Sequence, residues 1–159
     1  MKDDGSSKLI KEFNQLLKKM DNVYDKLAKS SGISDTAFWI IYTIKNEKET
    51  YKQKDLCVMW SYSKQTINSA LKKLEEQNII KLVSLPENKK DKKIILTDYG
   101  EQIAKELIDP VNEIEKESLK QLKEANIFID LFKKYIETME EKSENFLKKQ
   151  DRRNNEYDF

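Results

Sequence analysis

The 159-residue sequence contains no histidine, one cysteine and three glycines. Without histidine, the chain lacks the usual general base, proton shuttle and zinc ligand of enzyme sites. Its isolated glycines, Gly5, Gly32 and Gly100, cannot form the glycine-rich phosphate loops of nucleotide-binding proteins. Cys57 alone can form neither an internal disulfide nor a thiolate-cluster metal site. We therefore expect a protein that is not an enzyme and that uses no metal or cofactor.

Long hydrophobic segments are also missing. The chain has no apolar run of about 18 residues, and its N-terminus lacks the apolar segment of a signal peptide. The length fits one domain, residues 1–159, and an apolar content of 38% is enough for a core. We expect a cytoplasmic protein. Its formal net charge is only +1, so the distribution of charge, rather than the total, must indicate its partners.

Most of the sequence has the 3.6-residue apolar spacing of amphipathic helices. A first helix is predicted near residues 7–29, and a second begins after Ser34 as N-cap. Thr50 and Gln53 have the spacing of a capping box that opens a short third helix, and Ser63 is placed to cap a fourth. Two short helices joined by a tight turn, the second with polar groups exposed at its N-terminal end, are typical of a helix-turn-helix.

The fourth helix has an outward face that is unusually poor in acids. Its apolar residues Ile67, Ala70, Leu71 and Leu74 have the spacing of one buried stripe, and no acid precedes Glu75. Side chains that can reach base edges in a major groove are Gln65, Asn68 and Ser69. Side chains assigned to phosphates are Ser63, Lys64, Thr66, Lys72 and Lys73. An ordinary solvated helix of a bundle is the alternative.

A β-hairpin with a lysine-rich tip is predicted after this helix. KLVSL, residues 81–85, and the apolar run at residues 94–96 have strand patterns, and residues 86–93 form the tip. Lys89, Lys90 and Lys92 are the candidate phosphate contacts of this wing, although alone they would also fit a solvated loop. Residues 51–97 hold ten lysines and five acids, a net charge of +5, so the rest of the chain carries −4. Positive charge is therefore expected only in this segment.

The terminal helices carry more apolar surface than a small winged domain can cover. Residues 7–30 and 98–149 are predicted as dimerisation helices, the second segment beginning after Thr97 as N-cap. A homodimer would place two recognition helices about 34 Å apart and would need a near-palindromic operator. Residues 150–159 lack an apolar period, and we expect them to be disordered.

The order of these elements resembles the multiple-antibiotic-resistance regulator (MarR) family. The resemblance rests on KQKDLCVMWSYSKQTINSALKKLEEQNII and on ILTDYG, which is similar to the family's L-T-x-x-G. It implies a mainly α fold with a small β-wing, in which residues 34–97 are the winged helix-turn-helix and the chain ends build a homodimer. It also implies a small aromatic or lipophilic effector. The residues that could line its pocket, or simply form core, are Tyr24, Trp39, Tyr42 and Trp60.

Several positions depart from the family pattern. Asn88 and Lys90 stand where family wings commonly have Asp-x-Arg, and lysine lacks the planar fork of arginine. Ser61 and Asn78 replace frequent glycines. Cys57 occupies a position that is usually a small core residue, so a structural thiol is favoured over an oxidant sensor.

The sequence thus predicts a dimeric regulator that binds specific double-stranded DNA, as a repressor released by a small molecule. Two alternatives remain: a winged-helix module that binds a protein, and a redox switch that acts through the Cys57 thiol.

Overall fold

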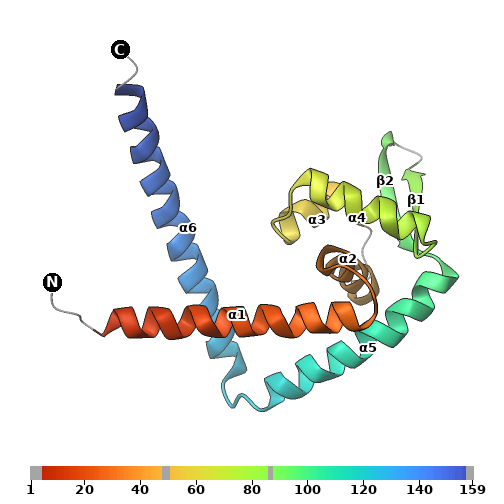
Figure 1. Ribbon diagram of the computed structural model, residues 1–159, viewed down its shortest axis with the longest axis horizontal. Helices are drawn as coiled ribbons and strands as arrows, with labels where there is room; N and C mark the ends of the chain where they lie inside the picture. Colours follow the sequence, from red (N-terminus) through yellow and green to blue (C-terminus); the bar gives the residue numbers. More distant parts are fainter. Residues whose placement is uncertain (1–4, 48–50, 86–87, 157–159) are drawn as a thin grey trace. The chain divides into compact units, whose positions relative to one another are not determined.

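The computed structural model describes residues 5–47, 51–85 and 88–156, without the side chains of 85, 88–91 and 154–156. It is mainly helical with one two-stranded antiparallel sheet, as predicted (Figure 1). The elements are α1 (Ser6–Ser30), α2 (Asp35–Asn46), α3 (Gln53–Met59), α4 (Lys64–Glu76), β1 (Ile80–Leu85), β2 (Asn88–Leu96), α5 (Asp98–Lys120) and α6 (Ala125–Glu156). None of the helices in the described ranges is long and apolar enough to cross a membrane.

The chain forms two compact units, Met1–Glu113 and Ile114–Phe159. The first contains the helix-turn-helix, the hairpin and most of α5, and the second contains α6. The sequence assigns both to one domain, and that assignment stays a prediction.

Side-chain caps fix the starts of α2 and α4. Ser34 Oγ accepts a hydrogen bond from the Ala37 backbone N–H at 3.3 Å, and Ser63 Oγ accepts one from the Thr66 N–H at 3.1 Å. Each bond satisfies a donor that the first turn of a helix leaves without a partner. Both predicted N-caps are therefore confirmed.

Helix α3 begins differently from the prediction. Gln53 is its first residue, Lys52 is the N-cap, and the Lys52 N–H donates to Asp55 Oδ2 at 2.8 Å. The capping box predicted at Thr50 and Gln53 is wrong because the carboxylate of Asp55, two residues beyond Gln53, takes this role; Thr50 itself lies outside the described residues.

The core of the first unit lies between α2, α4, the hairpin and α5. The predicted buried stripe of α4, Ile67, Ala70, Leu71 and Leu74, is confirmed. Fully buried partners from the other elements are Phe38, Ile40, Ile41, Leu56, Ile80, Ile108 and Val111. Burial on this side leaves the polar face of α4 toward solvent.

The hairpin pairs Ile80 with Leu96 and Val83 with Lys93, with an irregularity between Ser84 and Leu85. Strand β2 already begins at Asn88, so the predicted tip over residues 86–93 is wrong from Asn88 onward. The backbone ladder continues past the last apolar positions because pairing in a two-stranded ribbon needs no apolar side chains.

The Thr97–Gly100 segment joins α5 to the turn after α4. Thr97 Oγ1 donates to the Asn78 carbonyl at 2.6 Å and accepts from the Gly100 N–H at 2.9 Å, while the Thr97 N–H donates to the Ile79 carbonyl at 3.0 Å. A Cβ on Gly100 would lie 1.9 Å from the Ile79 carbonyl oxygen. The L-T-x-x-G pattern therefore has a local structural reason, and the predicted capping role of Thr97 is confirmed.

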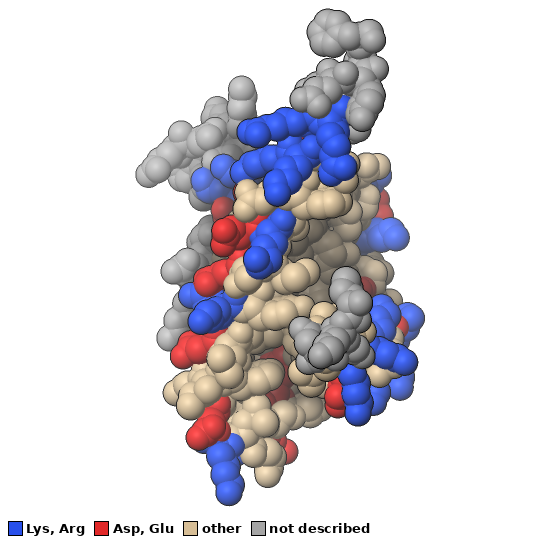
Figure 2. Space-filling view, turned by 90° about the vertical axis from the view of Figure 1, so that its left-hand side faces the viewer, with Lys and Arg blue, Asp and Glu red and all other residues tan. Residues whose placement is uncertain are grey.

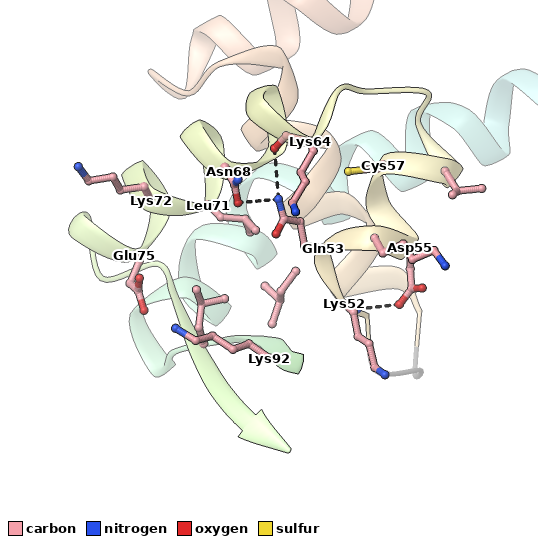
Figure 3. A pocket seen from close by; sticks show the side chains of 14 residues that line it. Lys52, Gln53, Asp55, Cys57, Lys64, Asn68, Leu71, Lys72, Glu75 and Lys92 are labelled. Carbon is pink, nitrogen blue, oxygen red and sulfur yellow. Dashed lines mark hydrogen bonds between the residues drawn. The ribbon is translucent and has the colours of Figure 1, made fainter. Parts of the chain in front are cut away.

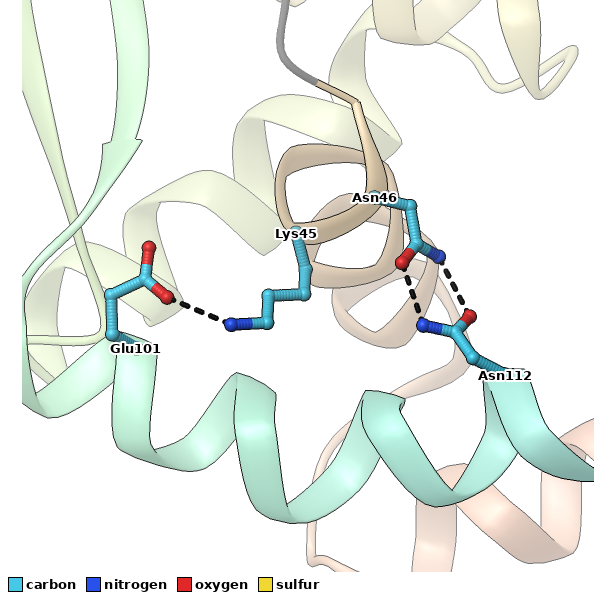
Figure 4. Close-up of polar contacts among 4 residues, drawn as sticks. All are labelled: Lys45, Asn46, Glu101 and Asn112. Carbon is cyan, nitrogen blue, oxygen red and sulfur yellow. Dashed lines mark hydrogen bonds and ion pairs between the residues drawn. The ribbon is translucent and has the colours of Figure 1, made fainter.

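Two polar contacts tie the C-terminal end of α2 to α5 (Figure 4). Lys45 Nζ lies 3.1 Å from Glu101 Oε2. Asn46 and Asn112 exchange two side-chain hydrogen bonds, of 2.9 and 2.7 Å. Together they set the position of α5 along α2.

In the second unit, α6 continues to Glu156, so the predicted helix end at Lys149 and the disorder expected for residues 150–156 are wrong. An established helix gains a backbone hydrogen bond per added residue without needing an apolar stripe, and this segment has no glycine or proline. Residues 157–159 lie outside the described residues. Lys and Arg side chains gather at the C-terminal end of α6 (Figure 2). The exposed residues there are Lys148, Lys149, Arg152 and Arg153, so positive charge is not limited to residues 51–97.

Candidate DNA-binding surface

The turn between α3 and α4 positions the exposed face of α4. Ser61 has a φ of 53°, a left-handed conformation that is uncommon for a residue with a side chain, and it reverses the chain before Ser63 caps α4. All eight α4 candidates are exposed, as predicted: Ser63, Lys64, Gln65, Thr66, Asn68, Ser69, Lys72 and Lys73. Exposure is the condition that contact with DNA requires.

A cleft of about 1160 Å³ lies between α3, α4 and the hairpin (Figure 3). Of the predicted DNA contacts, it brings together Lys64, Asn68 and Lys72 from α4 and Lys92 from β2. Its two acids, Asp55 and Glu75, are outnumbered by five lysines. The cleft is therefore positively charged and open to solvent.

Other predicted contacts lie elsewhere. Ser63, Gln65, Thr66 and Ser69 do not line this cleft, and Lys73 lines a smaller hollow next to Gly32 at the turn between α1 and α2. The side chains of Lys89 and Lys90 lie outside the described residues.

The sequence did not assign a DNA role to Lys52, Gln53 and Lys54, which line the cleft at the start of α3. Gln53 Nε2 donates to Asn68 Oδ1 at 2.5 Å and to the Lys64 carbonyl at 3.2 Å. The consecutive polar residues were the available signal in the sequence. Gln53 and Lys64 are eleven positions apart, and nothing in the sequence indicated that they are in contact.

Lys72 has a carboxylate neighbour on its own helix. Its Nζ lies 3.8 Å from Glu76 Oε1, one turn further along α4, and both side chains are largely exposed. Such an exposed pair contributes little free energy in water. A phosphate can therefore replace Glu76 as the partner of Lys72 at small cost.

An aromatic cluster joins α1, α2 and the C-terminal end of α3. The structure brings together all four side chains predicted for an effector pocket: ring centroids are 4.8 Å apart for Tyr24 and Trp39, 4.3 Å for Trp39 and Trp60, and 5.4 Å for Trp39 and Tyr42. Rings at these distances pack against each other as a core cluster would. Their role as a pocket stays a prediction.

Hydrogen bonds connect this cluster to the turn before α4. Asp35 accepts from Trp39 Nε1 at 3.1 Å and from the Tyr62 hydroxyl, and Trp60 Nε1 donates to Thr43 Oγ1 at 2.8 Å. Burial, reinforced by the Asp35 carboxylate, raises the pKa of Tyr62 to about 12. The N-terminal end of α2 thus holds the turn in place.

Cys57 is half-buried, packs against the core and also lines the cleft. Its contact with the core agrees with a structural thiol, and its reactivity stays untested. No group of three or more potential metal ligands occurs among the described residues.

A polar recognition helix preceded by a short helix and followed by a β-hairpin defines a winged helix-turn-helix. The MarR family model matches residues 31–91. No curated protein matches the chain. The chain therefore matches this family model over its helix-turn-helix and part of its hairpin, and it has the winged-helix fold seen in solved MarR-family structures.

Solved structures share the fold over most of the chain. A MarR family regulator from Neisseria meningitidis is 22% identical, with 86% of this chain and 98% of that one covered and a TM-score of 0.71. MepR of Staphylococcus aureus, in its DNA-binding conformation, is 17% identical, with 84% of this chain and 97% of that one covered and a TM-score of 0.68. PcaV of Streptomyces coelicolor, in complex with its natural ligand, is 16% identical, with 78% of this chain and 91% of that one covered and a TM-score of 0.60.

Proposed function

We propose that this protein binds a specific double-stranded DNA operator as a homodimer and represses transcription. The observation that carries the proposal is the basic cleft beside the exposed polar face of α4. A major groove about 12 Å wide admits one such helix, and cationic side chains on either side can then reach phosphates. A dimer bound across a promoter blocks polymerase without further contacts.

The contacts divide into two classes. Gln65, Asn68 and Ser69 read base edges, because amide and hydroxyl groups match the donors and acceptors of the major groove. Lysines of α4 and the wing, with the hydroxyls of Ser63 and Thr66, position the backbone. Lys89 and Lys90 belong to the same proposal from their place in the sequence.

Uncovered apolar side chains support the homodimer. In α1, Leu9 is 67% exposed and Leu16 is 56% exposed; in α6, Leu131 is 63% exposed. Exposed apolar residues repeat along both helices, and contiguous apolar surface of this kind marks an interaction site. A second copy of the chain would supply two recognition helices about 34 Å apart.

Release by a small aromatic or lipophilic effector completes the proposal. The close packing of Tyr24, Trp39, Tyr42 and Trp60 offers apolar surface to such a molecule. The solved complex of PcaV with its natural ligand makes a ligand reasonable in this fold. Binding would shift the population toward a spacing of recognition helices that no longer fits successive grooves.

The division of roles can be tested with two substitutions and one control. An operator is first selected from a random duplex library, and affinities are then measured on it and on random DNA at several salt concentrations. Gln65→Ala should weaken specific binding by about 1–3 kcal/mol at one base pair if the contact is bidentate. Lys92→Ala should weaken binding to all sequences and lower the salt slope by about 0.9.

Lys105→Ala removes an exposed lysine of α5 and is the matched control. It should change neither the affinity for the operator nor the salt slope. Equal losses on operator and random DNA for both Gln65→Ala and Lys92→Ala would contradict the division of roles. A selection that yields no preferred sequence would favour a winged-helix module that binds a protein.

A further inference from the structure

Gln53 makes two contacts with α4 that affect how Asn68 can be used. Its side-chain Nε2 donates to the Lys64 backbone carbonyl at 3.2 Å and to Asn68 Oδ1 at 2.5 Å (Figure 3). Gln53 is half-buried at the start of α3, whereas Asn68 is exposed on α4. The contact therefore joins a fixed side chain to one that faces solvent.

The Lys64 carbonyl determines the orientation of both amides. A carbonyl oxygen can only accept, so the Gln53 group facing it must be the NH₂. The second hydrogen of that NH₂ is then directed at Asn68, which must present its oxygen. Oδ1 and Nδ2 are on opposite arms of the amide, so the two donors of Asn68 Nδ2 remain available away from α3.

We propose that Gln53 is a specificity-determining residue that fixes Asn68 as a hydrogen-bond donor toward the DNA. The inference rests on the proposed function and deepens it. Asn68 then selects a base whose major-groove hydrogen-bonding groups are all acceptors: N7 and O6 of guanine or O4 of thymine, whereas adenine presents the N6 donor beside its N7 acceptor. Asparagine without such support commonly pairs bidentately with adenine, a contact that needs both its oxygen and its NH₂ at the base.

Substitutions at Gln53 give a sharp test. Gln53→Met keeps the length of the side chain but removes both donors, so the Asn68 amide can turn over and its base preference should fall. Gln53→Glu supplies only acceptors, so Asn68 should turn its NH₂ toward α3 and its oxygen toward the DNA. The preferred base at that position should then present a donor, N4 of cytosine or N6 of adenine.

A carboxylate in the first turn of a helix is favourable, so Gln53→Glu is expected to fold. Its added negative charge weakens binding to every sequence alike, and the ratio of affinities between operators that differ at one base pair removes this common effect. The measured quantity is therefore that ratio.

The experiment begins with selection of an operator by the full-length protein and with Asn68→Ala, which locates the base pair that Asn68 reads. All four bases are then compared at this position for the wild type, Gln53→Met and Gln53→Glu. The wild type should bind an operator with guanine or thymine at this position about fivefold or more tightly than one with cytosine or adenine. A fivefold ratio is about the lower end of the discrimination that a specific base contact gives. The preference should shrink in Gln53→Met and change to cytosine or adenine in Gln53→Glu.

An unchanged preference in both Gln53 variants, with a selected operator in hand, would overturn the role of Gln53 and leave the proposed function intact. Absence of any selected operator would overturn both. An NMR measurement on the protein without DNA separates these cases. The two protons of the Gln53 side-chain NH₂ should both resonate downfield, as hydrogen-bonded protons do. Asn68→Ala should move one of these two resonances upfield. Two solvent-like resonances would contradict the contact itself.

Discussion

Gly100 lies where the first turn of α5 meets the backbone of Ile79. Any Cβ at this position would clash with a carbonyl oxygen at 1.9 Å, and backbone cannot move aside as a flexible side chain can. We expect Gly100→Ala to lower the free energy of unfolding by about 1–3 kcal/mol or more, as overpacking does. Urea unfolding measures the loss.

Gly32 provides the control for this prediction. It has a φ of 70° and open space around its Cα, so Gly32→Ala should cost only about 1 kcal/mol of left-handed strain. A smaller loss for Gly100→Ala than for Gly32→Ala would show that the close approach to Ile79 is relieved elsewhere.

Tyr62 makes the stability dependent on pH at the alkaline end. Its pKa is raised from 10 to about 12, so the neutral hydroxyl is favoured in the folded state. The stabilisation from Tyr62 is then fully present below about pH 10 and is lost as the pH rises toward about 12. The difference in unfolding free energy between wild type and Tyr62→Phe should be constant near about pH 8 and shrink above about pH 10.

Both proteins contain the same lysines. The difference between their unfolding free energies at each pH therefore cancels the contribution of lysine titration. A difference that stays constant up to about pH 12 would show that neither burial nor Asp35 raises the pKa of Tyr62 in the folded state.

Several single-residue features could be predicted from sequence because they depend on neighbours in the chain. Ser34 and Ser63 are followed at once by helical patterns, and both cap as expected. Ser61 and Asn78, at positions where the resembled family was expected to have glycine, have φ values of 53° and 56°, in the left-handed region that glycine adopts most easily. The contact of Gln53 with Asn68 could not be predicted, because it depends on how α3 packs against α4.

At the scale of elements, the reciprocal pair of Asn46 and Asn112 joins the end of α2 to α5. Each partner donates and accepts, so replacing one leaves two groups of the other without their protein partner. A double-mutant cycle with Asn46→Ala and Asn112→Ala should give a coupling of about 0.5–1.5 kcal/mol, the net range of a hydrogen bond. Additive effects, with no coupling, would indicate that water replaces the pair at no cost.

The errors in predicting elements have a common cause. The start of α3, the length of β2 and the end of α6 all lie in polar segments, where the apolar period that locates helices and strands is missing. Backbone hydrogen bonding continues through such segments. Helix α4 and the core of the hairpin were predicted well because their buried residues have a clear period.

At the scale of the whole molecule, the apolar residues of α1 and α6 carry the prediction of a dimer. Leu131→Lys places a charge in the stripe of α6 that includes Phe128 and Tyr135, and it should shift the protein toward monomer. Because two half-sites are then bound independently, operator affinity should fall by well over tenfold, a loss of avidity. Sedimentation velocity and operator titration give the two readouts.

Asn126→Lys adds the same charge to α6 outside the apolar stripe and should leave both readouts unchanged. Operator affinity that stays at the wild-type level while Leu131→Lys is monomeric would contradict the need for a dimer.

The central claim is that the face built by α4 and the hairpin reads DNA sequence. Its most direct test is a titration of the purified protein against the duplex upstream of its own gene, at two salt concentrations and with random competitor. The account predicts binding that survives the competitor, with a logarithmic affinity that falls steeply and linearly with the logarithm of salt concentration. Equal affinity for random and upstream DNA, together with failure to select any preferred sequence from a random library, would contradict it.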